Sequence, residues 1–360
     1  MSEQHNANKS NNLHGRLLAS VSAIALLSFA SGSALADDDT DRPNLWIELG
    51  GQLEQMQTGQ QPFAPAFALK PQPKFETVTP IKAEAPPRFA IGGEGKLTFE
   101  PTDSDWVFSA AIRYGRSNGD KNVHNQTVYP SLHFSSGFSE PVYDDAYATT
   151  IAKHNESHMV LDFQVGRDVG LGFLGRDSVL SFGVRYAQLS SNTTVSMNER
   201  PHIDIRNSAI KYFHSYALSG HSERSFHAVG PSLSWDGSAP LIGNDNGAHF
   251  TFDWGANAAI LLGRQKANVS HKTSGRYVEV KYGHQQQTPY HITGGHAGAH
   301  TVTVPNLGGF AGVSLKFPNA KVSLGYRGDF FFGAMDGGID KRESKTLGFY
   351  GPFATVSVGL

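Results

Sequence analysis

Hydrophobic and polar residues alternate along the end of the chain, from Phe349 to Leu360, which reads F-Y-G-P-F-A-T-V-S-V-G-L. Successive side chains of a β-strand point to opposite faces, so a two-residue period sorts these residues into two groups. One group is mainly apolar and the other mainly small or polar: Tyr350, Ala354, Val356, Val358 and Leu360 against Gly351, Phe353, Thr355, Ser357 and Gly359. The pattern predicts a terminal strand with one apolar face.

The same period recurs upstream. We expect further strands with their centres at residues 45–54, 89–99, 106–114, 158–165, 180–186, 225–235, 250–262, 311–317 and 322–332. With the terminal strand this makes about ten. Eight or twelve strands are the alternatives, because Pro231 interrupts the sixth strand and residues 209–220 and 277–283 could form an extra hairpin.

Long and short connections alternate between these predicted strands. Short turns are expected at residues 101–105, 170–177, 243–247 and 318–320, and longer polar connections at residues 62–87, 117–156, 190–224, 264–304 and 335–345. Residues 62–87 contain seven prolines, which exclude a paired strand there. An even strand number with long connections at one end is typical of bacterial outer-membrane barrels, whereas a soluble β-sandwich has no reason to segregate its connections.

The sequence therefore predicts an all-β fold: a single transmembrane antiparallel up-and-down β-barrel with long extracellular loops and short periplasmic turns. A strand at the C-terminus fits this fold, because the last strand closes the ring and removes the open edges that lipid does not tolerate. We expect outer-membrane lipid around the barrel and the barrel-assembly machinery, acting through the C-terminal strand, as its partners.

The first 36 residues resemble a cleaved signal peptide. Lys9 and Arg16 precede an apolar run at residues 17–30, and Ala34-Leu35-Ala36 provides a small-x-small cleavage site. Residues 37–360 are then the barrel domain, exported to the bacterial outer membrane. No later apolar run reaches the 18 or so residues of a transmembrane helix.

Composition narrows the function further. The chain has 30 Lys+Arg and 32 Asp+Glu, a net charge of −2, without the basic patch or stripe that nucleic-acid binding requires. Cysteine is absent, so neither disulfides nor thiolate metal sites are available.

Several short motifs, in their order along the chain, are similar to the Legionella-type major outer membrane protein family of pore-forming barrels. They are Gly183-Val184-Arg185-Tyr186, Phe226-His227-Ala228-Val229-Gly230-Pro231, Leu324-Gly325-Tyr326-Arg327 and Gly351-Pro352-Phe353. Two positions depart from the expected pattern: Ala228 replaces a glycine, and the chain ends in Leu360 where such barrels usually end in phenylalanine. The resemblance implies a pore in the outer membrane that passes ions or small solutes.

Charged side chains fall on the face opposite the apolar one. The residues expected to line the lumen are Glu48, Glu94, Lys96, Arg113, Asp162, Arg185, Asp253, Arg327 and Asp329. Rings of charge set selectivity in a wet channel. The alternative is that these charges pair across a narrow interior and fill it, because a ten-stranded barrel lies between filled small barrels and open large ones.

Other chemistry is less well supported. Histidines at 284, 291, 296 and 300 are zinc or copper ligands by type, but their spacing matches no recognised site, so we expect a solvated loop without metal or cofactor. Asp144-Asp145 and His202-Ile203-Asp204 lie where surface proteases of this size carry catalytic residues, yet they form no positioned base, and we expect no enzyme activity. A non-conducting barrel whose loops at 117–156 or 264–304 bind a surface or partner is the alternative function.

Overall fold

The computed structural model describes residues 44–58, 89–102, 104–132, 141–169, 177–200, 211–243, 248–281 and 284–360. The predicted signal peptide and the proline-rich connection lie outside these ranges. The described residues form ten strands: β1 (Leu45–Thr58), β2 (Phe89–Phe99), β3 (Trp106–Leu132), β4 (Pro141–Asp168), β5 (Asp177–Arg200), β6 (Lys211–Gly243), β7 (His249–Lys281), β8 (His284–Lys316), β9 (Ala320–Asp336) and β10 (Ser344–Gly359). Among them no helix is long and apolar enough to cross a membrane.

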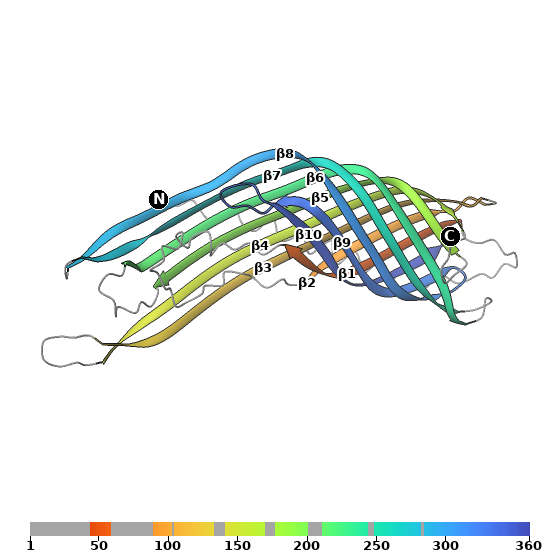
Figure 1. Ribbon diagram of the computed structural model, residues 1–360. Helices are drawn as coiled ribbons and strands as arrows, with labels where there is room; N and C mark the ends of the chain where they lie inside the picture. The colour runs from red at the N-terminus through yellow and green to blue at the C-terminus, as the bar shows by residue number, and fades with distance from the viewer. Residues whose placement is uncertain are drawn as a thin grey trace, which may run out of the picture. The chain divides into compact units, whose positions relative to one another are not determined.

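The strands form one closed antiparallel barrel in sequence order (Figure 1). Each strand pairs with the next, and β1 closes the ring on β10, from Trp46 opposite Gly359 to Thr58 opposite Leu347. The predicted fold class and the count of ten strands are confirmed. We call the end with the start of β1 and the end of β10 the basal end, and the opposite end the far end.

The apolar face of each strand points outward from the ring. Ile91, Phe182 and Phe163 are 78%, 65% and 61% exposed, values that place them on the outer surface. On β7 the apolar positions run from Phe250 to Leu262. This is roughly 40 Å of strand at about 3.3 Å per residue. A tilt of about 45° converts that length to a band close to the roughly 25 Å height typical of membrane barrels.

The longest strands continue far beyond the ring. β6, β7 and β8 have 33 residues each, whereas a transmembrane strand needs only about 9–11. The loops predicted at residues 117–156, 190–224 and 264–304 are therefore wrong as loops, since most of each is paired strand. The prediction relied on apolar residues that alternate on an outward face, while the backbone pairing continues where the outer face is polar and the apolar residues, such as Val195 and Leu218, lie on the inner face.

The far end is consequently an open sheet above a closed ring (Figure 1). β2 pairs with β3 only up to Arg116, and β9 pairs with β8 only from Asn306 onward. Beyond these points β3 to β8 form a six-stranded sheet that β1, β2, β9 and β10 do not accompany. Residues 211–220 and 277–281, considered as extra strands, are the far ends of β6 and β7.

Pro231 lies within β6 without ending it. It is exposed on the outer face and opposite Val184 of β5, and the register to β7 is the same on both sides of it. Proline removes one backbone donor from the ladder. The adjacent Gly230 lies so close to the Ile260 carbonyl that a Cβ could not fit there. The interruption is therefore local, and the sixth strand is one of the three longest.

Candidate functional site: the barrel lumen

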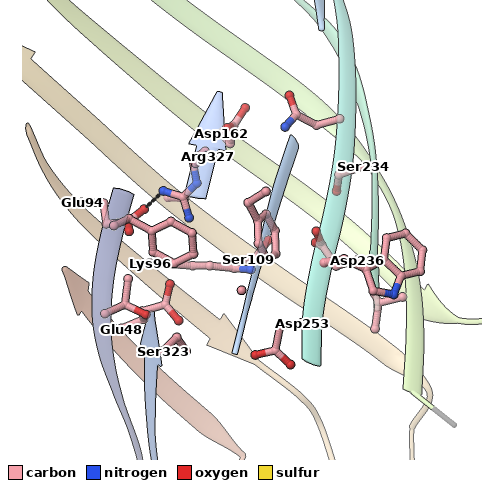
Figure 2. A pocket seen from close by; sticks show the side chains of 18 of the residues that line it. Glu48, Glu94, Lys96, Ser109, Asp162, Ser234, Asp236, Asp253, Ser323 and Arg327 are labelled. Atoms are coloured by element: carbon pink, nitrogen blue, oxygen red, sulfur yellow. Dashed lines mark hydrogen bonds and ion pairs between the residues drawn. The ribbon is translucent and has the colours of Figure 1, made fainter. Parts of the chain in front are cut away.

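All nine residues predicted to line the lumen point into the barrel. Eight of them border a cavity of about 380 Å³ near the basal end: Glu48, Glu94, Lys96, Arg113, Asp162, Arg185, Asp253 and Arg327 (Figure 2). The ninth, Asp329, is fully buried beside them. We call this level of the lumen the charged layer.

Arg185 is the centre of the charged layer and is only 2% exposed. Its Nε donates to Asp162 Oδ1 at 2.7 Å and its Nη2 to Asp162 Oδ2 at 3.0 Å, a two-pronged contact between neighbouring strands. Its Nη1 donates to Asn257 Oδ1 at 2.6 Å and to Asn306 Oδ1. One guanidinium therefore links β5 to β4, β7 and β8 across the interior.

Arg113 adds a second bridge from β3. It donates to Asp329 of β9 and lies 3.7 Å from Asp162. Asp329 in turn lies 3.9 Å from Arg185. A buried charge is tolerated only with such partners. The pairing across the lumen that the sequence left as an alternative is therefore present.

Arg327 makes a separate contact nearer the cavity. It donates to Glu94 of β2 (Figure 2), and its guanidinium carbon lies 4.6 Å from the ring centre of Phe353 and 5.6 Å from that of Phe310. A cation against aromatic faces is favourable, and arginine stacks there especially well. The two rings hold Arg327 at the wall of the cavity.

A dry apolar layer follows the charged layer toward the far end. Its residues are 0–5% exposed: Met56, Ala90, Val160, Ala187, Leu189, Phe226, Ala228, Ala259, Leu261, Val304, Phe331, Ala334, Met335, Leu347 and Phe349. Phe331 and Phe349 stack with ring centres 5.6 Å apart. Side chains from nine strands, all except β3, thus pack together inside the ring at this level.

His158 and Glu54 lie beside the apolar layer. The His158 ring stacks on Phe349 at 3.9 Å, and its Nε2 lies 3.4 Å from Glu54 Oε1. Both residues are buried. Gly115 leaves room for this pair, because a Cβ there would collide with both side chains. The alternating pattern of β1 and β4 places Glu54 and His158 on inward faces, but no sequence signal indicates that they meet.

The connection between β9 and β10, residues 337–343, turns into the barrel. We call it the β9–β10 turn. β9 bends at Gly333, whose φ is 74°, and the β9–β10 pairing is irregular between Lys345 and Leu347. Residues 334–338 are all buried, so both faces of the chain are covered there. A strand in the barrel wall would alternate between exposed and buried positions.

His296 of β8 holds this turn through Asp336. Its Nε2 lies 2.9 Å from Asp336 Oδ2 and its Nδ1 lies 2.9 Å from the Ile339 carbonyl oxygen. Both partners only accept hydrogen bonds, so the ring satisfies both when it carries two protons. Asp336 Oδ1 also accepts from the backbone N–H groups of Gly338 and Glu343, each at 3.0 Å.

The pKa values of this pair follow from these contacts, which lie beyond the apolar band. Burial acts to lower the pKa of His296, but hydrogen bonds to Ile339 and Asp336 outweigh it and raise the pKa. Burial acts to raise the pKa of Asp336, but the Glu343 N–H, His296 and the Gly338 N–H together lower it. Both shifts favour the ion pair.

Side chains of β6 and β7, the strands that follow β8 around the ring from β9, also hold the turn. Arg224 Nη2 donates to Gly338 O at 2.9 Å, Gln265 Nε2 to Gly333 O at 3.3 Å, and Arg342 Nε to Gln265 Oε1 at 3.3 Å, while His271 Nε2 lies 2.6 Å from Asp340 Oδ1. β8 separates β7 from β9 in the ring. The turn therefore leaves the barrel wall and folds inward over the inner faces of β8, β7 and β6, next to the apolar layer.

Of the remaining candidates from the sequence, only His296 takes part in this site among the described residues. The four histidines of residues 284–300 lie on β8 and not in a loop, and in the described parts of the chain no group of three or more His, Asp or Glu is arranged to hold a metal ion. Asp144 and Asp145 are part of β4. Residues 202–204 lie outside the described ranges.

Fold and lumen together define a closed ten-stranded β-barrel with an apolar outer band and a lumen shut at mid-height. No protein-family model matches the chain, and no curated protein sequence does.

Three solved structures illustrate the fold comparison. The TodX deltaS2S3 mutant monoaromatic hydrocarbon channel is 8% identical over 89% of this chain and 91% of its own, with a TM-score of 0.25. The CymD monoaromatic hydrocarbon channel is 8% identical over 89% of both chains, with a TM-score of 0.23. The transport unit of the autotransporter AIDA-I from Escherichia coli is 8% identical over 94% and 98%, with a TM-score of 0.25. Scores this low carry no argument about function.

Proposed function

We propose that the protein is an integral outer-membrane barrel that forms a gated pore for ions or small solutes. One observation carries the proposal: a charged cavity ends at an apolar layer that an inward-folded turn covers. A barrel with only a structural role needs neither a polar chamber nor a hairpin end folded across its interior.

The apolar layer is the proposed gate. Narrow apolar constrictions stop ion flow by losing their water. Movement of the β9–β10 turn would withdraw Met335 and Leu347, which belong to both the hairpin and the apolar layer. The pore then opens from the far end, while the charged layer keeps the wall rigid.

The charges of the cavity are balanced in number. Six acidic and six basic residues border it: Glu48, Glu94, Glu100, Asp162, Asp236 and Asp253, with Lys96, Arg113, Arg185, Lys316, Lys321 and Arg327. Such a lining favours neither cations nor anions strongly. The proposal therefore includes weak charge selectivity.

Membrane location is part of the same proposal. The outward apolar band and the closed ring support it, because a closed barrel is one of the two architectures that satisfy all backbone groups in lipid. Fractionated cells test it directly: the protein should stay with outer membranes through washes with alkaline carbonate or urea and be extracted by detergent. Release without detergent would overturn the location.

Planar-bilayer recording tests the pore. Wild-type protein should conduct rarely, and a variant with residues 337–343 replaced by a shorter polar linker should show frequent discrete conductance steps. Pro318→Ala at the basal end is the matched control and should behave as wild type. Silence of both the wild type and the shortened variant, with both proteins folded, would reject the pore.

A non-conducting barrel that binds a partner is the second candidate. The length of β6, β7 and β8 favours it, because the strands extend well past any bilayer. Deleting residues 273–292 shortens the β7–β8 hairpin at the Lys272–Thr293 pair. Binding of cells to an abiotic or host surface should then be lost while the barrel remains folded. Unchanged binding would exclude this region as the binding surface.

A further inference from the structure

The outer face of five neighbouring strands changes from apolar to polar at nearly the same row of paired residues. The last apolar and first polar residues are Tyr114 and Arg116 on β3, Met159 and Ser157 on β4, Tyr186 and Gln188 on β5, Val229 and His227 on β6, and Leu262 and Arg264 on β7. Pairing places the last apolar residues directly opposite one another on β3 and β4 and on β5, β6 and β7, with an offset of two residues between β4 and β5. This line is the far-end edge of the apolar band.

Basic residues prevail on the outer face just beyond this edge. Among the outward residues whose side chains are described, five are basic and exposed: Arg116, Lys153, Arg264, Lys266 and Lys272. In the described part of the chain none of these five forms an ion pair, in contrast to the arginines of the lumen. One of these described outward residues is acidic: Glu223, whose Oε1 lies 3.4 Å from His221 Nε2.

Arg264 and Lys266 form the densest part of this surface. They lie two residues apart on the same face of β7, and Arg264 is opposite His227 of β6 and Thr301 of β8. Lys266 is opposite Ser225. The two cations thus sit directly beyond Leu262, with hydrogen-bonding side chains on both flanking strands. We call these positions the Arg264–Lys266 patch.

We propose that the Arg264–Lys266 patch binds the phosphate groups of lipid headgroups in the leaflet at the far end of the barrel. The inference rests on the proposed outer-membrane location. Unpaired cations at the edge of an apolar band lie at headgroup height, where each basic residue attracts anionic lipid and long side chains can reach the interface. A carboxylate paired with these cations would weaken phosphate binding, and the described side chains of the patch include no carboxylate.

Native mass spectrometry of the full chain in detergent tests the proposal with defined lipids. The probes are lipid A with two phosphates and the same lipid after removal of its phosphates. Wild-type protein should retain the phosphorylated form about thirtyfold more strongly, the factor expected from two interfacial charges. The Arg264→Gln, Lys266→Gln double variant should lose about that factor for the phosphorylated lipid and change little for the other.

The Lys153→Gln, Lys272→Gln double variant is the matched control. It removes the same charge from the same face, further from Leu262, and should reduce retention less than twofold. Equal retention of both lipids by wild type, or equal losses in the two double variants, would overturn the patch. Resistance of each variant to detergent-gel unfolding shows that it is folded. If the protein requires detergent for extraction and conducts, but retains both lipids equally, the lipid-binding proposal is wrong while the proposed function stands.

Discussion

The charged layer and the apolar layer occupy the same strands, the same inward faces and adjacent levels of the lumen. Asp162 and Val160 on β4 are two positions apart, as are Arg185 and Ala187 on β5 and Asp329 and Phe331 on β9. One level borders a cavity and is held by ion pairs, and the next is closed by contacts between apolar groups. The two levels should therefore respond differently to substitution.

The difference lies in what holds each level together. Ion pairs between strands fix specific partners, and removal of one partner leaves a buried charge. Apolar contacts are not directional and depend on the area removed from water. The charged layer is suited to keep the ring in shape, and the apolar layer is suited to open and close.

The largest effect is expected from Asp329→Ala, which removes the carboxylate that Arg113 contacts. Arg113 and Arg185 would then share the single carboxylate of Asp162, and breaking this buried pair should lower the free energy of unfolding by about 3 kcal/mol, the lower end for such pairs. Urea unfolding of the barrel in lipid vesicles, followed by tryptophan fluorescence, measures it. Arg167→Gln is the control, because the Arg167–Asp105 pair is exposed and should contribute less than about 1 kcal/mol. Equal effects would show that the charged layer is not structural.

A smaller loss is expected from Leu261→Ala in the apolar layer. The cost should be about 2 kcal/mol, at the lower end for leucine, because water from the cavity can enter the space. Conductance in planar bilayers should increase at the same time, which Asp329→Ala should not cause. An increase with Asp329→Ala and none with Leu261→Ala would reverse the assignment of the gate.

Asp336→Asn should loosen the β9–β10 turn without unfolding the ring. The change removes the charge that holds His296 and two backbone N–H groups, contacts worth about 1.5–3 kcal/mol when a charged group takes part. Hydrogen exchange of residues 334–343 should accelerate, while that of β4 and β5 should not. Asp340→Asn is the matched control, since the Asp340 side chain is 57% exposed and makes one contact to the turn's surroundings.

The smallest effect is a pH dependence of the same turn. The pKa of His296 is raised above 6.5, so its contribution is complete below that pH and is lost as pH rises through the raised value. The pKa of Asp336 is lowered below 3.8, so its contribution is complete above that pH and is lost only in stronger acid. Hydrogen exchange of the turn, corrected for intrinsic rates, should be slowest between these limits.

His296→Gln should remove this pH dependence above neutrality. Arg224, Asp336 and the Ile339 carbonyl face His296, and Arg224 keeps its charge in this range although burial lowers its pKa to about 10. An unchanged profile in the variant would assign the dependence to another group.

The strands of the ring were predictable because its apolar outer face and its polar lumen place different residue types at alternate positions. The inward placement of Arg185 and Asp329 follows from that alternation alone. It does not reveal that Asn257 and Asn306 complete the contacts of Arg185, because strand pairing across the ring is not encoded locally.

Two features could not be predicted from the alternation of apolar and polar residues along the sequence. The extensions of β6 to β8 are polar on their outer face, so the signal used for strands disappears although the backbone pairing continues. The β9–β10 turn was expected as an ordinary connection at residues 335–345. Its inward course depends on Asp336 meeting His296, forty positions away in the chain, and on the bend at Gly333.

A closed ring of strands has no edge strand, but the sheet that extends beyond the ring has two edge strands, β3 and β8. Along residues 117–132 of β3 and 284–305 of β8, one side of the backbone has no neighbouring strand among the described residues. Peptide groups there depend on solvent for the hydrogen bonds that closure supplies lower down. Open sheet edges therefore occur only beyond the apolar band, outside the region where a lipid environment would require every backbone group to be paired.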